Sequence, residues 1–300
     1  MDKPDKPVGL IGLGLMGSVF AARLRAAGFT VSGYDLDAAR GAALRECGGE
    51  PAGSIAEIGR SCDPVVLAVF STDQVEEVVA GDAGLVAAAQ GRSTPLTVLC
   101  TPTCDPDRIA ALAAHVATRG IALVDAPVSG TSAQVARGDS LGLTGGDKAA
   151  IDRAAPVLDA LFRHRVHVGA AGDAGRAKLA INLILGLNRL ALAEGLVFAE
   201  RLGLDPAAFL DVARRSAAAS QVMETKGPKM IGGDFAPEGR VRQTLKDAHL
   251  MLDQAHKIGQ ALPLLQIHAD VLEACIRHGE AERDNSIVIE EIRRRRGASA

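Results

Sequence analysis

The feature that most constrains the fold of this chain is the glycine pattern Gly12-Leu-Gly14-Leu-Met-Gly17. It follows an apolar run at residues 8–11 that predicts a strand, and it leads into residues 18–27, which predict a helix. In this setting the first glycine permits a tight turn, the second lets a pyrophosphate approach the backbone, and the third lets the helix pack closely on the strand. The pattern therefore predicts an anion-binding turn at a helix N-terminus.

Asp35 extends this prediction from a phosphate to a dinucleotide. It ends the second predicted strand, residues 29–34, and lies 23 residues after Gly12. A carboxylate at this place accepts both hydroxyls of an adenosine ribose and repels a 2′-phosphate. Because no lysine or arginine follows before Arg40, NAD is favoured over NADP as the cofactor. The alternative is an ordinary glycine turn with Asp35 on the surface. The residues expected to bind the cofactor here are Gly12, Gly14, Met16, Gly17 and Asp35.

The order of apolar runs predicts an α/β fold in two parts. Runs at 64–70, 96–100 and 121–124, with weaker ones at 141–144 and 166–168, alternate with helical segments, as in a doubly wound parallel sheet covered by helices. A long helical pattern follows at 175–202, and most of the remaining chain predicts helices, at 206–219, 245–258, 264–278 and 286–296. We therefore expect a dinucleotide-binding domain at 1–172 and a helical domain at 173–300, joined by the long helix.

Composition narrows the classes of function. The chain has 300 residues, of which 48% are hydrophobic, enough for a sizeable core. A net charge of −3, no Trp and one Tyr argue against a nucleic-acid partner. Five scattered cysteines favour a reduced, cytoplasmic protein, and Cys100 and Cys104 lack the second ligand pair of a zinc site. The charged start and the lack of an uncharged apolar run of about 20 residues predict neither a signal peptide nor a membrane span.

Four motifs in a fixed order carry a resemblance to a known family. They are Gly9–Gly17, Asp125–Gly130 (DAPVSG), Gly172–Asn182 (GDAGRAKLAIN) and Lys246-Asp247. With these motifs the chain resembles the β-hydroxyacid dehydrogenase family, typified by 3-hydroxyisobutyrate dehydrogenase. The resemblance implies an N-terminal Rossmann domain, a long interdomain helix and an all-α C-terminal domain through which subunits form a homodimer or homotetramer. It also implies metal-free, reversible oxidation of a small carboxylate substrate, a β-hydroxy acid, by NAD or NADP.

The resemblance assigns catalysis to Lys178 as general acid/base, together with Asn182. These residues are four apart, so their side chains share one face of a helix and could converge on one hydroxyl. Removing hydride from a carbinol carbon requires that the hydroxyl proton leave, and the reverse reaction requires a proton donor. A lysine can serve if burial and a nearby nicotinamide cation lower its pKa. The alternative for Lys178 alone is a solvated helix lysine.

The other residues implied by the resemblance bind the substrate or the cofactor. Ser129 and Gly130 are assigned to the substrate carboxylate, and a structural turn is the alternative. Thr131 stands where the family often has a glycine, and Ile181 where it usually has an asparagine; Thr131 suggests a polyhydroxy acid as substrate. Lys246 is expected to contact the cofactor, with an ion pair to Asp247 as the alternative. Three further residues match positions that surround the cofactor: Val69, Phe70 and Thr103.

Two other functions remain open from the sequence. An imine reductase shares the expected architecture, but such enzymes usually lack the lysine at the place of Lys178. A nucleotide-sensing module would bind the cofactor without turnover. A decarboxylating relative of the 6-phosphogluconate type would need a longer C-terminal domain and a phosphate pocket, neither of which the sequence offers. The pairs His249/His256 and His164/His167 are read as solvated or structural, and Asp284 as a cap of the last helix.

Overall fold

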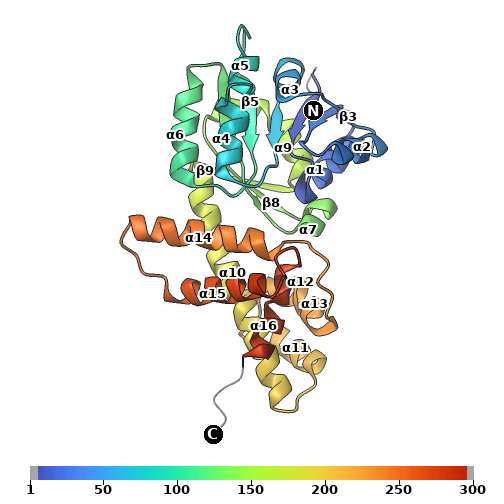
Figure 1. Cartoon of the computed structure of the whole chain (residues 1–300), viewed down its shortest axis with the longest axis vertical. Helices are drawn as coiled ribbons and strands as arrows, with labels where there is room; N and C mark the ends of the chain where they lie inside the picture. The colour runs from blue at the N-terminus through green and yellow to red at the C-terminus, as the bar shows by residue number, and fades with distance from the viewer. Residues whose placement is uncertain (1–5, 296–300) are drawn as a thin grey trace. The chain divides into compact units, whose positions relative to one another are not determined.

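The computed structural model describes residues 6–295, and the statements below concern these residues. The chain divides into two compact units, Met1–Lys178 and Leu179–Ala300. Helix α10 (Asp173–Arg201) begins in the first unit and continues into the second (Figure 1). The expectation about a signal peptide concerns mainly residues 1–5, which lie outside the described residues, as does the end of the predicted helix 286–296.

The first unit is built on one sheet. In spatial order its strands run β3 (Glu50–Pro51), β2 (Val31–Tyr34), β1 (Val8–Ile11), β4 (Val65–Leu67), β5 (Leu96–Cys100), β6 (Ile121–Asp125), β8 (Leu141–Gly145) and β7 (Val128–Ser129), and β9 (His164–Gly169) pairs with β8. The strands from β3 to β6 are parallel, which confirms the predicted parallel sheet. β8 is antiparallel to both β6 and β7, so the sheet is mixed at this end.

Helices cover both faces of this sheet, as Figure 1 shows. In β4, Val65 and Leu67 join one buried cluster and Val66 joins the other, because successive side chains of a strand point to opposite faces. The first cluster includes side chains of α3 (Ile55–Ser61), α4 (Thr72–Ala80), α5 (Leu85–Ala88) and α6 (Pro106–Ala117). The second includes side chains of α1 (Leu15–Ala26), α7 (Ser132–Arg137), α8 (Lys148–Arg153) and α9 (Ala155–Leu161). Burial on both faces explains why the central strands are continuous apolar runs.

The second unit is helical. Its elements after α10 are α11 (Pro206–Arg214), α12 (Gln221–Thr225), α13 (Gly227–Gly232), α14 (Val241–Lys257), α15 (Pro263–Arg277), a 3-10 turn (Asn285–Ile287) and α16 (Val288–Arg294). Leu196, Leu272 and Ile289 are among the buried side chains that form its core. The Asp205 carboxylate accepts a hydrogen bond from the Ala208 N–H, which confirms the predicted start of α11 with Pro206 in its first turn.

Several element boundaries differ from prediction. Helix α1 begins at Leu15 rather than residue 18, because the glycine turn runs directly into the helix. Helix α11 ends at Arg214 rather than 219. His164 and His167 lie on the exposed strand β9, a place that the sequence analysis did not specify. Helix α2 (Ala38–Glu46) follows β2. The connections further along contain α3 to α6, whose bounds the sequence analysis did not identify.

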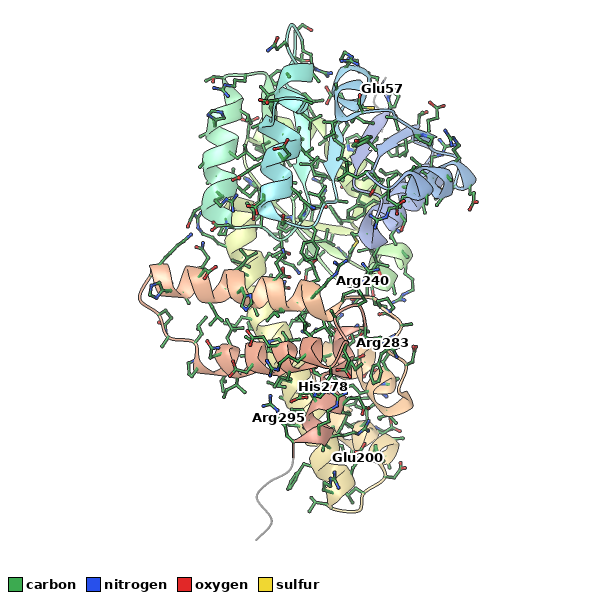
Figure 2. All side chains as sticks on the ribbon, viewed as in Figure 1. Glu57, Glu200, Arg240, His278, Arg283 and Arg295 are labelled. Atoms are coloured by element: carbon green, nitrogen blue, oxygen red, sulfur yellow. The ribbon has the colours of Figure 1, made fainter. Side chains whose placement is uncertain are left out.

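Helix α10 is apolar over much of its length. Among the described residues, α10 is the one helix that is long enough and apolar enough to cross a membrane, judged by length and composition alone. In its most apolar 18-residue window, 39% is buried. A core helix of a soluble protein passes the same test. Glu200, labelled in Figure 2, lies near the end of α10. Its carboxylate accepts a hydrogen bond from the Arg293 guanidinium at 3.2 Å, which ties α10 to α16 within the second unit. Arg293 forms a second ion pair with Glu290, so the cationic end of α16 is ion-paired.

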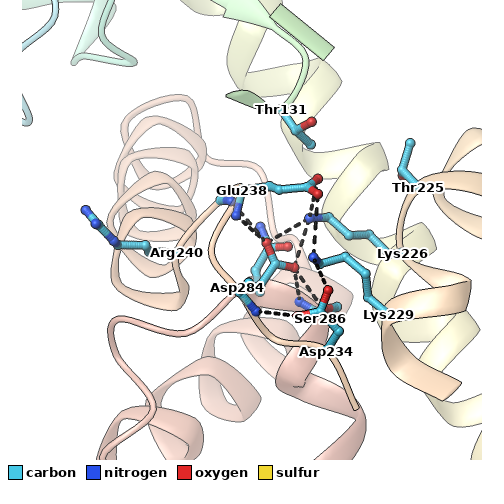
Figure 3. Close-up of polar contacts among 12 residues, drawn as sticks. Thr131, Thr225, Lys226, Lys229, Asp234, Glu238, Arg240, Asp284 and Ser286 are labelled. Carbon is cyan, nitrogen blue, oxygen red and sulfur yellow. Dashed lines mark hydrogen bonds and ion pairs between the residues drawn. The ribbon is translucent and has the colours of Figure 1, made fainter. Parts of the chain in front are cut away.

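A buried charge cluster organises the loop before α14 in the second unit (Figure 3). The Asp284 carboxylate, 0% exposed, accepts two hydrogen bonds of 2.9 Å from the Lys226 ammonium group. It also accepts backbone N–H bonds from Glu238 at 2.9 Å, Gly239 at 3.1 Å and Ser286 at 3.0 Å. The bond from Ser286 confirms that Asp284 caps the final helical segment. The remaining bonds join α12 and the 233–240 loop to the same carboxylate.

Candidate active site

The predicted cofactor residues follow the carboxyl ends of the parallel strands in the first unit. β1 lies between β2 and β4, so the strand order reverses between β1 and β4. Ligands of open α/β sheets bind at such a point, outside the carboxyl ends of the strands. The predicted residues follow β1 (Gly12, Gly14, Met16, Gly17), β2 (Asp35), β4 (Val69, Phe70) and β5 (Thr103).

The glycine turn after β1 has the geometry that the sequence pattern predicts. Gly12 has φ +92°, and a Cβ there would lie 2.6 Å from the Ala68 carbonyl oxygen. A Cβ on Gly17 would lie 1.9 Å from the Gly12 carbonyl oxygen, so only glycine lets α1 approach β1 this closely. A Cβ on Gly14 would meet only the Arg40 guanidinium within 4 Å, and no side chain caps this helix start. The open backbone at Gly14, before Met16 in the first turn, fits a dinucleotide phosphate.

Asp35 is tied to this turn. Its Oδ2 accepts the Leu13 N–H at 2.7 Å, and its Oδ1 accepts the Asp37 N–H at 2.9 Å. Burial raises the pKa of Asp35, but these bonds and the Arg40 guanidinium, 3.1 Å away, outweigh burial and hold the pKa below its ordinary value. The residue is therefore a carboxylate at neutral pH, as ribose binding requires. Arg40, which the sequence analysis noted only as the next cation, lies beside both Asp35 and Gly14.

The loops after β4 and β5 are linked. The Thr101 hydroxyl donates to the Leu67 carbonyl oxygen at 2.6 Å, so the start of one loop is bound to the end of the neighbouring strand. The Phe70 N–H donates to the Gln74 side chain at 2.7 Å, which shapes the turn between Val69 and α4. Thr103 is 9% exposed. The predicted cofactor residues Val69, Phe70 and Thr103 thus lie on adjacent loops at one edge of the sheet.

The loop after β6 contains the residues predicted to bind the substrate carboxylate. Ser129 lies in β7 and pairs with Leu141 of β8. Gly130 has φ +149°, and a Cβ there would lie 3.2 Å from the Ser140 Cβ. Thr131 caps α7: its hydroxyl oxygen accepts the Gln134 N–H at 3.2 Å, while the Gln134 side chain accepts the Thr131 N–H at 2.9 Å. Thr131 therefore has a structural task that the sequence analysis missed, although the Thr-x-x-Gln spacing of a capping box was present.

Lys178 lies on α10 and is 5% exposed, which separates it from the solvated lysine of the alternative interpretation. The start of α10 is held by Asp125, at the end of β6, whose Oδ2 accepts the Gly175 N–H at 2.7 Å. Asn182, four residues after Lys178, belongs to the second unit. The spacing places both side chains on one face of α10. The sequence analysis had not singled out Asp125, although it stands first in the DAPVSG motif.

Asp247 joins two predicted site residues in the second unit. Its carboxylate accepts a hydrogen bond from the Asn182 amide at 3.1 Å and forms an ion pair of 3.0 Å with the Lys246 ammonium. Lys246 thus makes the ion pair that the alternative interpretation expected, and its contact with a cofactor stays a prediction. Arg189, two turns beyond Asn182 on α10, is also buried; burial lowers its pKa to about 10, while Asp284 and Asp247 favour its charged form.

Comparisons with known proteins place the chain in a family. Residues 7–169 match the family model of the NAD-binding domain of 6-phosphogluconate dehydrogenase, and residues 172–292 match that of the NAD-binding region of NADP-dependent 3-hydroxyisobutyrate dehydrogenase. An L-threonate dehydrogenase of Cupriavidus necator is 34% identical over 95% of this chain and 95% of its own length. The chain belongs to the β-hydroxyacid dehydrogenase family. It is an NAD(P)-dependent oxidoreductase, and either NAD or NADP is consistent with the family.

Two further similarities support the assignment. A probable mitochondrial 3-hydroxyisobutyrate dehydrogenase-like protein of Arabidopsis thaliana is 30% identical over 99% of this chain and 97% of its own length. The crystal structure of a 3-hydroxyisobutyrate dehydrogenase from Salmonella typhimurium superposes with a TM-score of 0.85 at 28% identity, covering 95% of this chain and 99% of that one. The expected fold, with a Rossmann unit, a long helix and a helical C-terminal region, is confirmed.

The alternative functions are not favoured by these comparisons. An imine reductase from Pseudomonas sp. superposes with a TM-score of 0.65 at 18% identity, a likeness that concerns the fold alone. The named relatives above are dehydrogenases, which also disfavours a nucleotide-sensing module without turnover.

Among the described residues there is no group of three or more His, Cys, Asp or Glu side chains that could hold a metal ion. The roles of the individual site residues stay predictions.

Proposed function

We propose that this β-hydroxyacid dehydrogenase interconverts a small β-hydroxy acid and its semialdehyde or keto acid, with Lys178 as the general acid/base. The observation that carries the proposal is the burial of Lys178, which is 5% exposed on the same unit as the Gly12–Gly17 turn. Lysine side chains are seldom buried this completely, because their ammonium groups lose contact with water. The proposed task is proton exchange with the substrate hydroxyl.

The chemistry assigns one task to each residue. In oxidation, the neutral Lys178 amine takes the hydroxyl proton, while the carbinol hydrogen leaves the carbon with both electrons of the C–H bond, as hydride. The bound nicotinamide supplies the hydride acceptor. Asn182, held by Asp247, orients the substrate oxygen, and the backbone N–H groups near Ser129 and Gly130 receive the substrate carboxylate. In reduction, the Lys178 ammonium returns the proton as charge develops on the carbonyl oxygen.

The proposed substrate is a polyhydroxy acid of about four carbons. Two observations support it: a relative at 34% identity is named an L-threonate dehydrogenase, and Thr131 stands beside the proposed carboxylate loop. The Thr131 hydroxyl oxygen accepts a bond from Gln134, and its proton can still be donated to a substrate oxygen. We propose NAD as the preferred cofactor because the Asp35 carboxylate faces the place of a 2′-phosphate.

We further propose a cytoplasmic homo-oligomer, a dimer or tetramer, with neither membrane nor nucleic-acid partners. Exposed apolar residues on α10 support an association between subunits: Ile184 is 62% exposed and Phe198 is 65% exposed. The two are fourteen residues apart, so they lie on one face of the helix. Covering such a face with a second copy removes apolar surface from water.

A substrate panel tests the activity. Threonate, 3-hydroxyisobutyrate, glycerate and 3-hydroxypropionate are supplied with NAD or NADP, and tartronate semialdehyde with the reduced cofactors, while the nicotinamide absorbance is followed. We expect turnover with at least one of these acids, highest kcat/KM for threonate, and a preference for NAD. Threonate turning over no faster than 3-hydroxypropionate would refute the polyhydroxy acid assignment. Absence of turnover with all of them would refute the proposed activity.

The substitution Lys178→Ala tests the proposed catalytic role. We expect kcat to fall by about 10²–10⁴-fold, the usual contribution of a general acid/base, while NADH still binds with wild-type affinity. Lys148→Ala is the matched control, because the Lys148 side chain is 77% exposed on α8 and should leave kcat unchanged. A Lys178→Ala enzyme with wild-type turnover would remove Lys178 from the mechanism.

A further inference from the structure

Asp125 connects the end of β6, which precedes the Ser129–Gly130 loop, to the start of α10, which carries Lys178. It ends β6 and is 2% exposed. Its Oδ2 accepts the Gly175 N–H at 2.7 Å. Gly175 lies in the first turn of α10, three residues before Lys178. Because a helix is stiff over one turn, the place of Gly175 determines the place of the Lys178 backbone.

The surroundings leave this junction little freedom. A Cβ on Gly172 would lie 2.5 Å from the Pro106 carbonyl oxygen, so α10 begins in close contact with the start of α6. A Cβ on Gly175 would lie 3.3 Å from the Pro106 Cβ and 3.4 Å from Asp125 Oδ2. On the strand side, Asp125 pairs with Cys100 of β5 and with Gly145 of β8. The carboxylate is therefore fixed on a buried strand and holds the helix by its backbone.

We propose that Asp125 is a positioning residue: its carboxylate ties the first turn of α10 to the end of β6 and so holds Lys178 at a fixed place relative to the Ser129–Gly130 loop. The loop and the helix start both belong to the first unit, and Asp125 precedes Ser129 by four residues. This inference rests on the proposed role of Lys178. Asp125 acts through Lys178, and it needs no contact with the substrate.

The charge of Asp125 makes the proposal testable by pH. Burial raises the pKa of Asp125 to about 6, against the opposing effects of the Gly175 and Gly172 N–H bonds and of the Arg176 charge. Asp173 on α10 raises it further. Arg176 is itself paired with Asp173 and with Asp107 of α6, both at 2.8 Å. The buried Cys100 thiol is the neighbouring group on β5.

The two protonation states differ in how firmly they hold the helix. Above its pKa of about 6, the Asp125 carboxylate accepts the Gly175 N–H and complements the positive N-terminus of α10. Below this pKa, the neutral carboxyl group accepts the same N–H group more weakly. Lys178 should then be less well placed.

The experiment measures kcat for carbonyl reduction by NADH between pH 5 and pH 8. This direction uses the Lys178 ammonium as proton donor, so loss of its proton lowers the rate as the pH rises and cannot produce a fall in acid. We expect the wild-type kcat to fall below pH 6, by about tenfold at pH 5, since each pH unit below a single pKa changes the ionised fraction about tenfold. Asp125→Asn should show a low kcat with no such fall. An Asp125→Asn enzyme with the wild-type acid limb would overturn the proposal.

Two control variants distinguish a failure of the positioning role of Asp125 from a failure of the proposed function. Asp173→Asn removes the other carboxylate at the start of α10 and should keep an acid limb, because Asp173 accepts the Ala170 N–H and does not bond to Gly175. The limb should move to lower pH, since the Asp173 charge raises the pKa of Asp125. Lys178→Ala should be inactive at every pH. If Lys178→Ala is active, the proposed function fails; if only Asp125→Asn behaves as wild type, the positioning role alone fails.

A measurement on the wild-type protein applies if Asp125→Asn does not fold. Amide hydrogen exchange is followed by mass spectrometry for the peptide that contains Gly172 and Gly175. After correction for the intrinsic pH dependence, we expect exchange at the Gly175 amide to become faster below pH 6. Exchange that keeps the same corrected rate from pH 5 to pH 8 would show that protonation of Asp125 does not loosen the helix, and would contradict the proposal.

Discussion

At the scale of the residue, Asp35 combines a structural and a proposed recognition role. Its carboxylate holds the Leu13 N–H of the glycine turn and also pairs with Arg40. A negative charge here repels a 2′-phosphate, whereas the adjacent guanidinium would attract one. Asp35 therefore favours NAD and Arg40 favours NADP. Replacing each residue in turn shows which of the two charges determines the cofactor preference.

The prediction at this scale concerns cofactor preference. Asp35→Ala should raise kcat/KM for NADP relative to NAD by about tenfold or more, corresponding to about 1.4 kcal/mol of lost repulsion. Arg40→Ala should change the same ratio in the opposite direction. The ratio is measured from initial rates with each cofactor. Glu46→Ala is the control, because Glu46 is exposed at the end of α2 and should leave the ratio unchanged. An unchanged ratio in Asp35→Ala would contradict the proposed preference for NAD.

At the scale of the element, the buried pair of Lys226 and Asp284 holds α12, the 233–240 loop and the start of α16 together (Figure 3). Burial raises the pKa of Asp284, but the Lys226 ammonium and the backbone N–H bonds outweigh burial, and the net pKa is below its ordinary value of 3.8. A folded pKa below the unfolded one means that the carboxylate stabilises the fold above about pH 4 and that this contribution is lost as the pH falls.

Lys226→Met should therefore destabilise the protein strongly. Removing one partner of a buried ion pair leaves the other charge uncompensated, at a cost of about 3–5 kcal/mol. Urea unfolding at pH 7 measures this loss, and the difference from wild type should shrink in acid, where Asp284 is protonated. Lys229→Met is the matched control: it removes pairs with Asp234 and the half-buried Glu238, so its loss should be about 1 kcal/mol or less. Equal losses for the two variants would contradict the argument.

At the scale of the whole molecule, the exposed apolar face of α10 requires explanation. Ile184, Ala191 and Phe198 recur every seven residues and are exposed, so an apolar stripe follows one side of this helix. The same composition lets α10 pass a length and hydropathy test for a membrane span. The proposed homo-oligomer covers the stripe with a second copy and accounts for its apolar character without a membrane.

Phe198→Glu should weaken the proposed association. A carboxylate placed in an apolar interface must be desolvated without a partner, which disfavours assembly by several kcal/mol. Light scattering coupled to size exclusion should show a smaller mass than for wild type. Val166→Glu serves as the control, because Val166 is 49% exposed on β9 of the first unit and should leave the mass unchanged. A wild-type mass for Phe198→Glu would place any interface elsewhere.

The sequence by itself determined the local features of this protein. The glycine turn requires a positive φ at Gly12 and a missing side chain at Gly17, and such requirements are written in residue types. The central strands are buried on both faces and so appear as unbroken apolar runs. The family could also be recognised, because four short motifs keep their order along the chain.

Only the tertiary structure decided which residues far apart in the sequence form hydrogen bonds with each other. Asp125 meets Gly175, Asp247 meets Asn182, and Asp284 meets Lys226 across 50 to 65 residues of chain, and no local pattern encodes such pairs. The antiparallel orientation of β8 also depended on the strand that the fold placed beside it. The physical reason is that hydrogen bonds and desolvation act over a few ångströms of space, whereas sequence patterns report on neighbours along the chain.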